Sequence, residues 1–158
     1  MKLKRRLSPL VVALIAGAPA ARAVEAQPVA ECPPEFRLTA PQELVAPPDE
    51  GATREVLTWV SLDGWRGVEG LALRIRKLTV APGGWVPLHW HNDRPSVDYI
   101  IEGVLVEHNS FCSVELPHHA GDAANRFGDF HAHWWVNQTD KAVVLVSADV
   151  VPLDQVNY

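Results

Sequence analysis

The chain has 158 residues, with 14 lysines and arginines against 19 aspartates and glutamates, which gives a formal net charge of −5. This length favours one domain. An acidic protein repels phosphate backbones, which argues against nucleic acid as a partner. The sequence also contains no nucleophile elbow, phosphate-binding loop or dinucleotide fingerprint, so serine hydrolases, kinases and nicotinamide enzymes are set aside.

Residues 1–23 have the layout of a cleavable secretory signal. Four basic residues between positions 2 and 6 precede an apolar stretch over residues 7–20, which is too short to span a bilayer comfortably. Ala21-Arg22-Ala23 then offers small residues at the cleavage positions. We therefore expect an exported protein, periplasmic or secreted, with no stable membrane association after cleavage; the alternative is a retained membrane anchor. The mature chain would carry a net charge of −10, because the signal holds five basic residues and no acidic one.

Residues 24–53 are rich in proline and alanine, a composition that disfavours helices and central strands. We expect an extended arm that lies along the main domain, residues 54–158; the alternative is a partly disordered leader. The two mature cysteines, Cys32 and Cys112, predict a disulfide, because an even cysteine count in an exported chain is typical of a structural bridge. Two free thiols are the alternative.

Strand patterns begin at residue 54. Residues 55–60 are rich in β-forming side chains, and residues 71–80 show the alternation of side chains between two faces that is typical of a strand. In the second stretch we expect the apolar residues at positions 71, 73 and 75 to be buried. Arg74 and Arg76 are then exposed, with a bulge or change of parity near Lys77.

The stretch over residues 81–108 centres on His89-Trp90-His91. Side chains two residues apart in a strand project to the same face, so both imidazoles can reach one point. Imidazole is the commonest protein ligand for transition metals. Glycine-containing turns before and after this stretch favour an all-β barrel or sandwich.

The remaining stretches complete the pattern of short strands. Residues 104–108 form a strand with His108 at the surface or rim. His118 and His119 belong to a loop with turn chemistry and are expected to be solvated. Residues 120–125 carry no strong strand signal, and residues 142–151 form a long apolar strand that closes the barrel. Between them, His131 and His133 share one parity with Trp135 and Asn137, so all four can face inward.

The two histidine-bearing stretches resemble the two motifs of the cupin superfamily. In the first motif a glycine, the His-x-His pair, an acidic residue and a second glycine follow one another at fixed spacing. Those positions are Gly84, His89, His91, Ser96 and Gly103, with serine in place of the acidic ligand. The second motif, His-x-x-x-Asn, is met by His133 and Asn137, without its usual Pro-x-Gly. Arg94-Pro95 and the His-Trp-Trp-x-Asn sequence resemble a branch of small cupins, and the likeness covers roughly residues 71–151.

This resemblance implies a cupin-type double-stranded β-helix, the jelly-roll barrel, with the proline-rich arm outside it. It implies one divalent metal ion, Fe, Mn, Ni, Cu or Zn, bound by His89, His91 and His133, because only His133 has an asparagine four residues later. His131 then lies near the site without binding the ion, and Trp135 walls the pocket. Ser96 and Asn137 lie close by.

If position 96 keeps the inward orientation of the acidic ligand that it replaces, Asp98 also faces the cavity. Asp98 is then a candidate base or ligand, against a hydrogen-bonded carboxylate without a chemical role. The leading functional interpretation is a metal-dependent dioxygenase-like enzyme acting on a small organic substrate. The alternative is a non-catalytic module that binds a small ligand. The resemblance also implies a homodimer, because cupins often pair through sheet edges.

Overall fold

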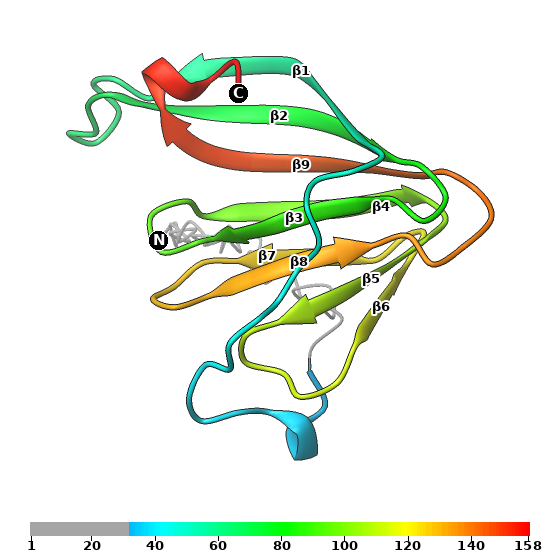
Figure 1. Ribbon diagram of the computed structural model, residues 1–158. Coiled ribbons are helices and arrows are strands. Elements are labelled where there is room, and N and C mark those ends of the chain that lie inside the picture. The colour runs from blue at the N-terminus through cyan, green and yellow to red at the C-terminus, as the bar shows by residue number, and fades with distance from the viewer. Residues whose placement is uncertain (1–31) are drawn as a thin grey trace, which may run out of the picture.

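The computed structural model describes residues 32–158, so the predicted signal segment and the first residues of the arm lie outside the described part (Figure 1). Within residues 32–158, nine strands form two antiparallel sheets. The strands are β1 (Ala52–Ser61), β2 (Leu71–Val80), β3 (Trp85–Trp90), β4 (Ser96–Glu102), β5 (Val104–Asn109), β6 (Leu116–His119), β7 (Ala123–Arg126), β8 (Ala132–Val136) and β9 (Val143–Pro152). Two short 3₁₀ turns flank them, η1 (Pro34–Phe36) and η2 (Leu153–Gln155). The predicted all-β jelly-roll fold is confirmed.

The strands alternate between the sheets, so chain neighbours rarely share one. One sheet has the order β1-β2-β9-β4-β7 and the other the order β3-β8-β5-β6. The main hydrophobic core lies between the sheets, because its buried side chains come from both of them. They are Leu78, Val80, Val86, Ile100, Leu105, Ala124, Trp135, Val143 and Leu145. No helix in this described part is long and apolar enough to cross a membrane.

The arm runs over the outer face of the four-stranded sheet (Figure 1). Leu44 and Ala46 pack there against a cluster that includes Trp134 of β8. The structure joins Cys32 and Cys112 by a disulfide, with Cα atoms 5.7 Å apart. This bridge ties the start of the described arm to the connection between β5 and β6. The same connection is bound by the arm a second time, through backbone hydrogen bonds such as Leu38 N to Phe111 O.

The predicted orientation of β2 is wrong. Arg74 is 2% exposed and points between the sheets, whereas Leu73 is 39% exposed on the outer face. The pairing of β2 with β9 is continuous, so no change of parity occurs near Lys77; the irregularity lies in β1, between Val56 and Thr58. Arginine is tolerated inside because β9 places a buried carboxylate, Asp149, directly opposite Arg74. A charge that is paired and hydrogen-bonded can replace an apolar residue at an inward position.

The predicted solvated loop around His118 is also wrong. His118 belongs to β6, which pairs with β5, and its side chain is fully buried. His119, one position later, points to solvent. The alternation of the strand therefore divides the His-His pair between the core and the surface. Residues 120–125 carry no strong strand signal, yet Ala123–Arg126 form β7, which pairs with β4.

Candidate metal centre

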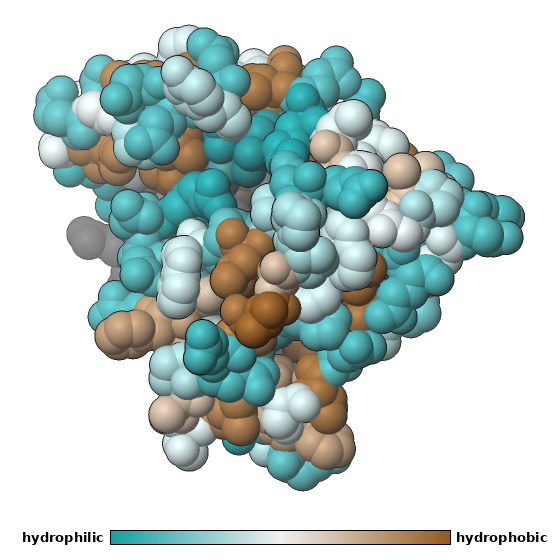
Figure 2. All heavy atoms as spheres, in the orientation of Figure 1, coloured by the Kyte–Doolittle hydropathy of each residue, from teal (hydrophilic) through white to brown (hydrophobic). Residues whose placement is uncertain are grey.

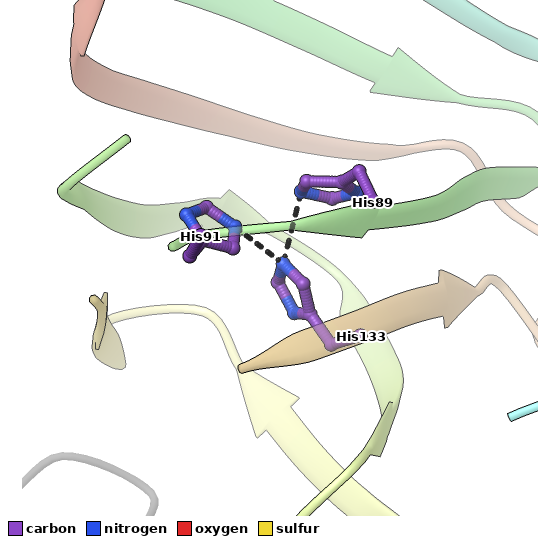
Figure 3. Close-up of side chains that lie close together, drawn as sticks. All are labelled: His89, His91 and His133. Carbon is purple, nitrogen blue, oxygen red and sulfur yellow. Dashed lines mark hydrogen bonds between the residues drawn. The ribbon is translucent and has the colours of Figure 1, made fainter. Parts of the chain in front are cut away.

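Three histidines from two neighbouring strands of one sheet meet inside the barrel (Figure 3). His89 lies in β3, His91 follows the end of that strand, and His133 lies in β8 directly opposite His89. The three rings come within 4.4 to 4.9 Å of one another, measured between centroids. The structure thus brings together the three residues that the two sequence motifs singled out.

Each of these rings uses its Nδ1 atom for a hydrogen bond to a fixed oxygen. Nδ1 of His89 lies 2.8 Å from the carbonyl oxygen of Pro87, and Nδ1 of His91 lies 2.8 Å from that of Arg94. Nδ1 of His133 lies 3.0 Å from the carboxylate of Glu107. Carbonyl and carboxylate oxygens only accept hydrogen bonds, so these contacts favour the tautomers in which Nδ1 carries the proton. Nδ1 of His133 also lies 2.6 Å from the indole Nε1 of Trp135, itself a donor, so Trp135 and Glu107 compete for this nitrogen. In the tautomers protonated at Nδ1, Nε2 is a bare lone pair.

These lone pairs point at one another. Nε2 of His133 lies 3.0 Å from Nε2 of His91 and 3.0 Å from Nε2 of His89, as the dashed lines in Figure 3 mark. Acceptors packed in this way repel unless a cation lies between them. Two nitrogens on neighbouring positions of an octahedral ion, each about 2.1 Å from it, lie about 3.0 Å apart. All three ligand atoms lie within 4.8 Å of one another, and imidazole nitrogens suit transition metals. The donor set therefore fits a transition-metal ion.

The protonation state of the rings agrees with this. Burial lowers the pKa of His89 to about 4 and that of His91 to about 3, against the weaker opposite effect of their backbone hydrogen bonds. Burial also holds the pKa of His133 well below its usual range. Metal ligation requires neutral imidazole, so the folded chain presents the three rings in the required form at neutral pH.

Glu107 is the residue at this centre that the sequence analysis missed. Its carboxylate is fully buried and accepts hydrogen bonds from His133, His118 and Asn109, and from Nε and Nη2 of the Arg126 guanidinium. Burial alone would raise the pKa of Glu107, but the charge of Arg126 and the two histidine hydrogen bonds hold it well below the usual value. The ionised carboxylate fixes the ring of His133, as carboxylates behind metal-binding histidines do.

A signal for Glu107 was present in the parity of β5. If His108 lies at the surface, its neighbour Glu107 must point inward. The structure shows this division: His108 stacks on Trp134 at the outer face, with ring centroids 3.8 Å apart, while Glu107 points into the barrel.

A cavity of about 270 Å³ opens beside the histidines, with His89 and His133 in its wall. Trp135 and Asp98 line it too. Asp98 lies outside the group of three ligand atoms, and burial raises the pKa of its carboxyl group, against a hydrogen bond with Ser147. Its position therefore suits a base better than a ligand.

The other predicted site residues have different surroundings. Ser96 is buried, with its hydroxyl 3.4 Å from Nδ1 of His91. His131 lies 6.0 Å from His91 between ring centroids, and it lines a second cavity next to Glu107. Asn137 is not part of the cavity wall.

The Asn137 amide instead holds two turns together. It donates to the carbonyl oxygens of Val80, Ala81 and Lys141 and accepts from Thr139. A role in turn geometry therefore accounts for this residue.

Comparison with known protein families matches residues 36–156 to the family described as Cupin. No curated protein matches the chain. Among solved structures, the fold is similar to a cupin-2 domain from Rhodospirillum rubrum, at 22% identity and a TM-score of 0.50 over 73% of this chain and 70% of that one. It is similar to KdgF from Halomonas sp., at 15% identity and a TM-score of 0.50 over 66% and 83%. At these identities the structural likeness concerns the fold alone.

Proposed function

Because the chain belongs to the cupin family, we propose that it is an exported metal-dependent enzyme of the oxygenase type that acts on a small organic molecule. The observation that carries the proposal is the convergence of the Nε2 atoms of three neutral imidazoles, His89, His91 and His133, beside a cavity. Neutral imidazoles leave the charge of a divalent ion uncompensated, and three ligands leave positions free for an anionic or hydroxide ligand.

The identity of the metal decides the chemistry. Fe, Mn, Ni or Cu supplies the electron transfer that reaction with O₂ requires, whereas Zn supplies Lewis acidity alone. The residues of the chain have separate tasks. Glu107 orients the ring of His133, and Trp135 lines the wall of the cavity. Asp98 lies in the same wall with a raised pKa, where it can take a proton from a substrate.

The test is O₂ uptake by protein that has been loaded with each of the five metals under reducing, anaerobic conditions. A panel of small organic molecules is then added with air-saturated buffer. We expect substrate-dependent O₂ consumption with at least one redox-active metal, and its loss in His133→Ala. His119→Ala is the matched control, because His119 is exposed on the outer face of β6.

The second candidate is a non-catalytic module that binds a small ligand. Ser96 favours it, since a hydroxyl stands where the related sequence motif has an acidic metal ligand. Such a module gains thermal stability from its ligand without consuming O₂ or changing the ligand. Ligand-induced stabilisation with no turnover under any of the five metals would select this candidate.

A further inference from the structure

Arginines line the cavity beside the three histidines. Arg76 reaches it from β2 and Arg94 from the loop between β3 and β4. On the face shown in Figure 2, hydrophilic residues gather between the strands at the top of the molecule and β3 below them. Arg76 was predicted to be exposed. It lines the cavity because its side chain lies on the inward-facing side of β2.

The other arginines of the cavity wall have their own partners. Arg54 of β1 pairs with Asp49, at 2.9 Å. Arg74 binds both carboxylate oxygens of Asp149, at 3.0 and 2.8 Å, and also donates to main-chain carbonyl oxygens of η2 and the residue that follows it. These two guanidinium groups are satisfied by the protein.

Arg76 and Arg94 are not satisfied in the same way. Arg76 makes one contact of 2.9 Å to Asp149, a carboxylate that Arg74 already engages at both oxygens. Within residues 32–158, the side chain of Arg94 has neither an ion pair nor a hydrogen bond. The Nε atoms of both arginines are buried and lack a hydrogen-bond partner in this same part of the chain. Buried donors of this kind are uncommon in folded proteins and call for a partner.

The charges near these two arginines do not balance. Four arginine side chains line the cavity against three aspartates: Asp49 pairs with Arg54, Asp149 is shared by Arg74 and Arg76, and Asp98 is the third. Even with Asp98 ionised, these side chains carry one positive charge in excess. Burial, followed by the charges of Arg74 and Arg94, lowers the pKa of Arg76, against the opposite effect of Asp149. One negative charge from a ligand would remove the imbalance.

The rest of the cavity wall is apolar. Leu78, Val86, Leu145 and Trp135 all belong to the main core and contribute to the same cavity. A ligand that satisfies both parts of the wall has an anionic head and a carbon skeleton. The planar, forked guanidinium group matches the two oxygens of a carboxylate. A volume of about 270 Å³ limits the ligand to a small molecule.

We propose that the cavity binds a small carboxylic acid, with its carboxylate held by Arg76 and Arg94 and its carbon skeleton against Trp135 and the neighbouring aliphatic side chains. This names the substrate class of the proposed enzyme and in that sense rests on the proposed function. The contact between the carboxylate and the arginines does not itself require a metal.

The test measures binding by calorimetry and thermal shift on the full-length mature protein, both metal-loaded and after treatment with a chelator. The probes are sodium salts of small carboxylic acids from acetate to benzoate and 2-naphthoate, each paired with its neutral amide, together with inorganic phosphate. The variants are Arg94→Gln and Arg76→Gln. Lys77→Gln is the matched control, because Lys77 is next to Arg76 and lies half-exposed in an ion pair with Glu55.

We expect at least one carboxylate to bind more tightly than its amide and more tightly than phosphate. Loss of one charged hydrogen-bonding partner should weaken binding about 10- to 100-fold in Arg94→Gln, with no change in Lys77→Gln. Arg94→Gln is decisive if Arg76→Gln is unstable, because Arg94 makes no ion pair that folding would lose.

Equal binding of acids and amides, binding of phosphate alone, no binding by any probe, or full affinity in Arg94→Gln would each overturn the proposal. Failure of the metal hypothesis gives a different pattern. Carboxylates would then bind in an Arg94-dependent way to protein that takes up no metal. Conversely, protein that binds metal but does not discriminate acids from amides refutes the carboxylate site and leaves the metal centre intact.

Discussion

The carboxylate of Glu107 lies 3.0 Å from Nδ1 of His133, and both side chains are at most 1% exposed. This contact favours a proton on Nδ1 of His133, while Nε2 faces His89 and His91. Arg126, bound to the same carboxylate, compensates the buried negative charge. The geometry of the three-histidine cluster thus depends on an ion pair that lies behind it.

Glu107→Gln should therefore weaken metal binding by about 10- to 100-fold, because an amide is a poorer and less selective acceptor for the imidazole N–H. The variant should also unfold more readily, since the buried Arg126 loses its counter-charge. Competition with a chelator of known affinity measures the first effect and denaturant unfolding of the metal-free protein the second. Glu115→Gln, at an exposed position, is the control, and equal metal affinity in Glu107→Gln and the parent would contradict the assigned role.

Asp98→Asn should raise the melting temperature of the metal-free protein at pH 8. Burial raises the pKa of Asp98, so the folded state holds this proton more tightly than the unfolded chain does. The resulting stability is complete below the unfolded pKa, about 3.9, and is lost as the pH rises through the folded pKa. Asparagine has no such loss, so the advantage of the variant should shrink as the pH falls towards 4.

Thermal unfolding from pH 4 to pH 8 checks this, with the exposed Asp93→Asn as a control that shows no such trend. A lower melting temperature for Asp98→Asn than for the parent at pH 8 would mean that its carboxylate is stabilised when ionised. That result would remove Asp98 as a candidate base with a raised pKa.

Reduction of the Cys32–Cys112 bridge should destabilise the domain. The cysteines are 80 residues apart, and loop-closure entropy for a loop of this size corresponds to about 4 to 5 kcal/mol. Urea unfolding with and without dithiothreitol measures the difference. Cys32→Ser/Cys112→Ser should show the lower stability in both conditions. An unfolding midpoint of the parent protein that is the same with and without dithiothreitol would contradict the structural role of the bridge.

Gly103→Ala should destabilise by about 2 to 4 kcal/mol, because two costs combine. Gly103 has φ +89°, and an added Cβ would lie 2.8 Å from Cγ2 of the buried Val143. Gly121→Ala separates the two costs, since Gly121 has φ +96° but open space around its Cα. Denaturant unfolding should give the larger loss for Gly103→Ala, and equal losses would show that contact with Val143 is unimportant.

The sequence was sufficient for the fold class and for the three clustered histidines. Period-two alternation and motif spacing place His89, His91 and His133 on inward positions, and inward positions of adjacent strands converge in a barrel. Trp135 and Asp98 followed from the same parity. Asn137 did not reach the cavity, because its amide is used by the turns on either side.

The buried polar residues around the site could not be predicted in this way, because their hydrogen-bond and ion-pair partners come from strands that are distant in the sequence. Arg74 looked exposed since arginine is usually at the surface. Its inward position becomes stable only when β9 supplies Asp149 opposite it, 75 residues later. His118 is likewise buried because Glu107 receives its Nε2 hydrogen bond. Export and the homodimer stay predictions.

Elemental analysis of the mature, tag-free protein tests the central claim most directly. The parent should contain a stoichiometric divalent transition metal after reconstitution, His89→Ala/His91→Ala should lose it, and the exposed-site variant His119→Ala should keep it. Parent protein that stays metal-free after reconstitution with Fe, Mn, Ni, Cu and Zn under reducing, anaerobic conditions would contradict the claim. Retention of the metal in the double variant would do the same.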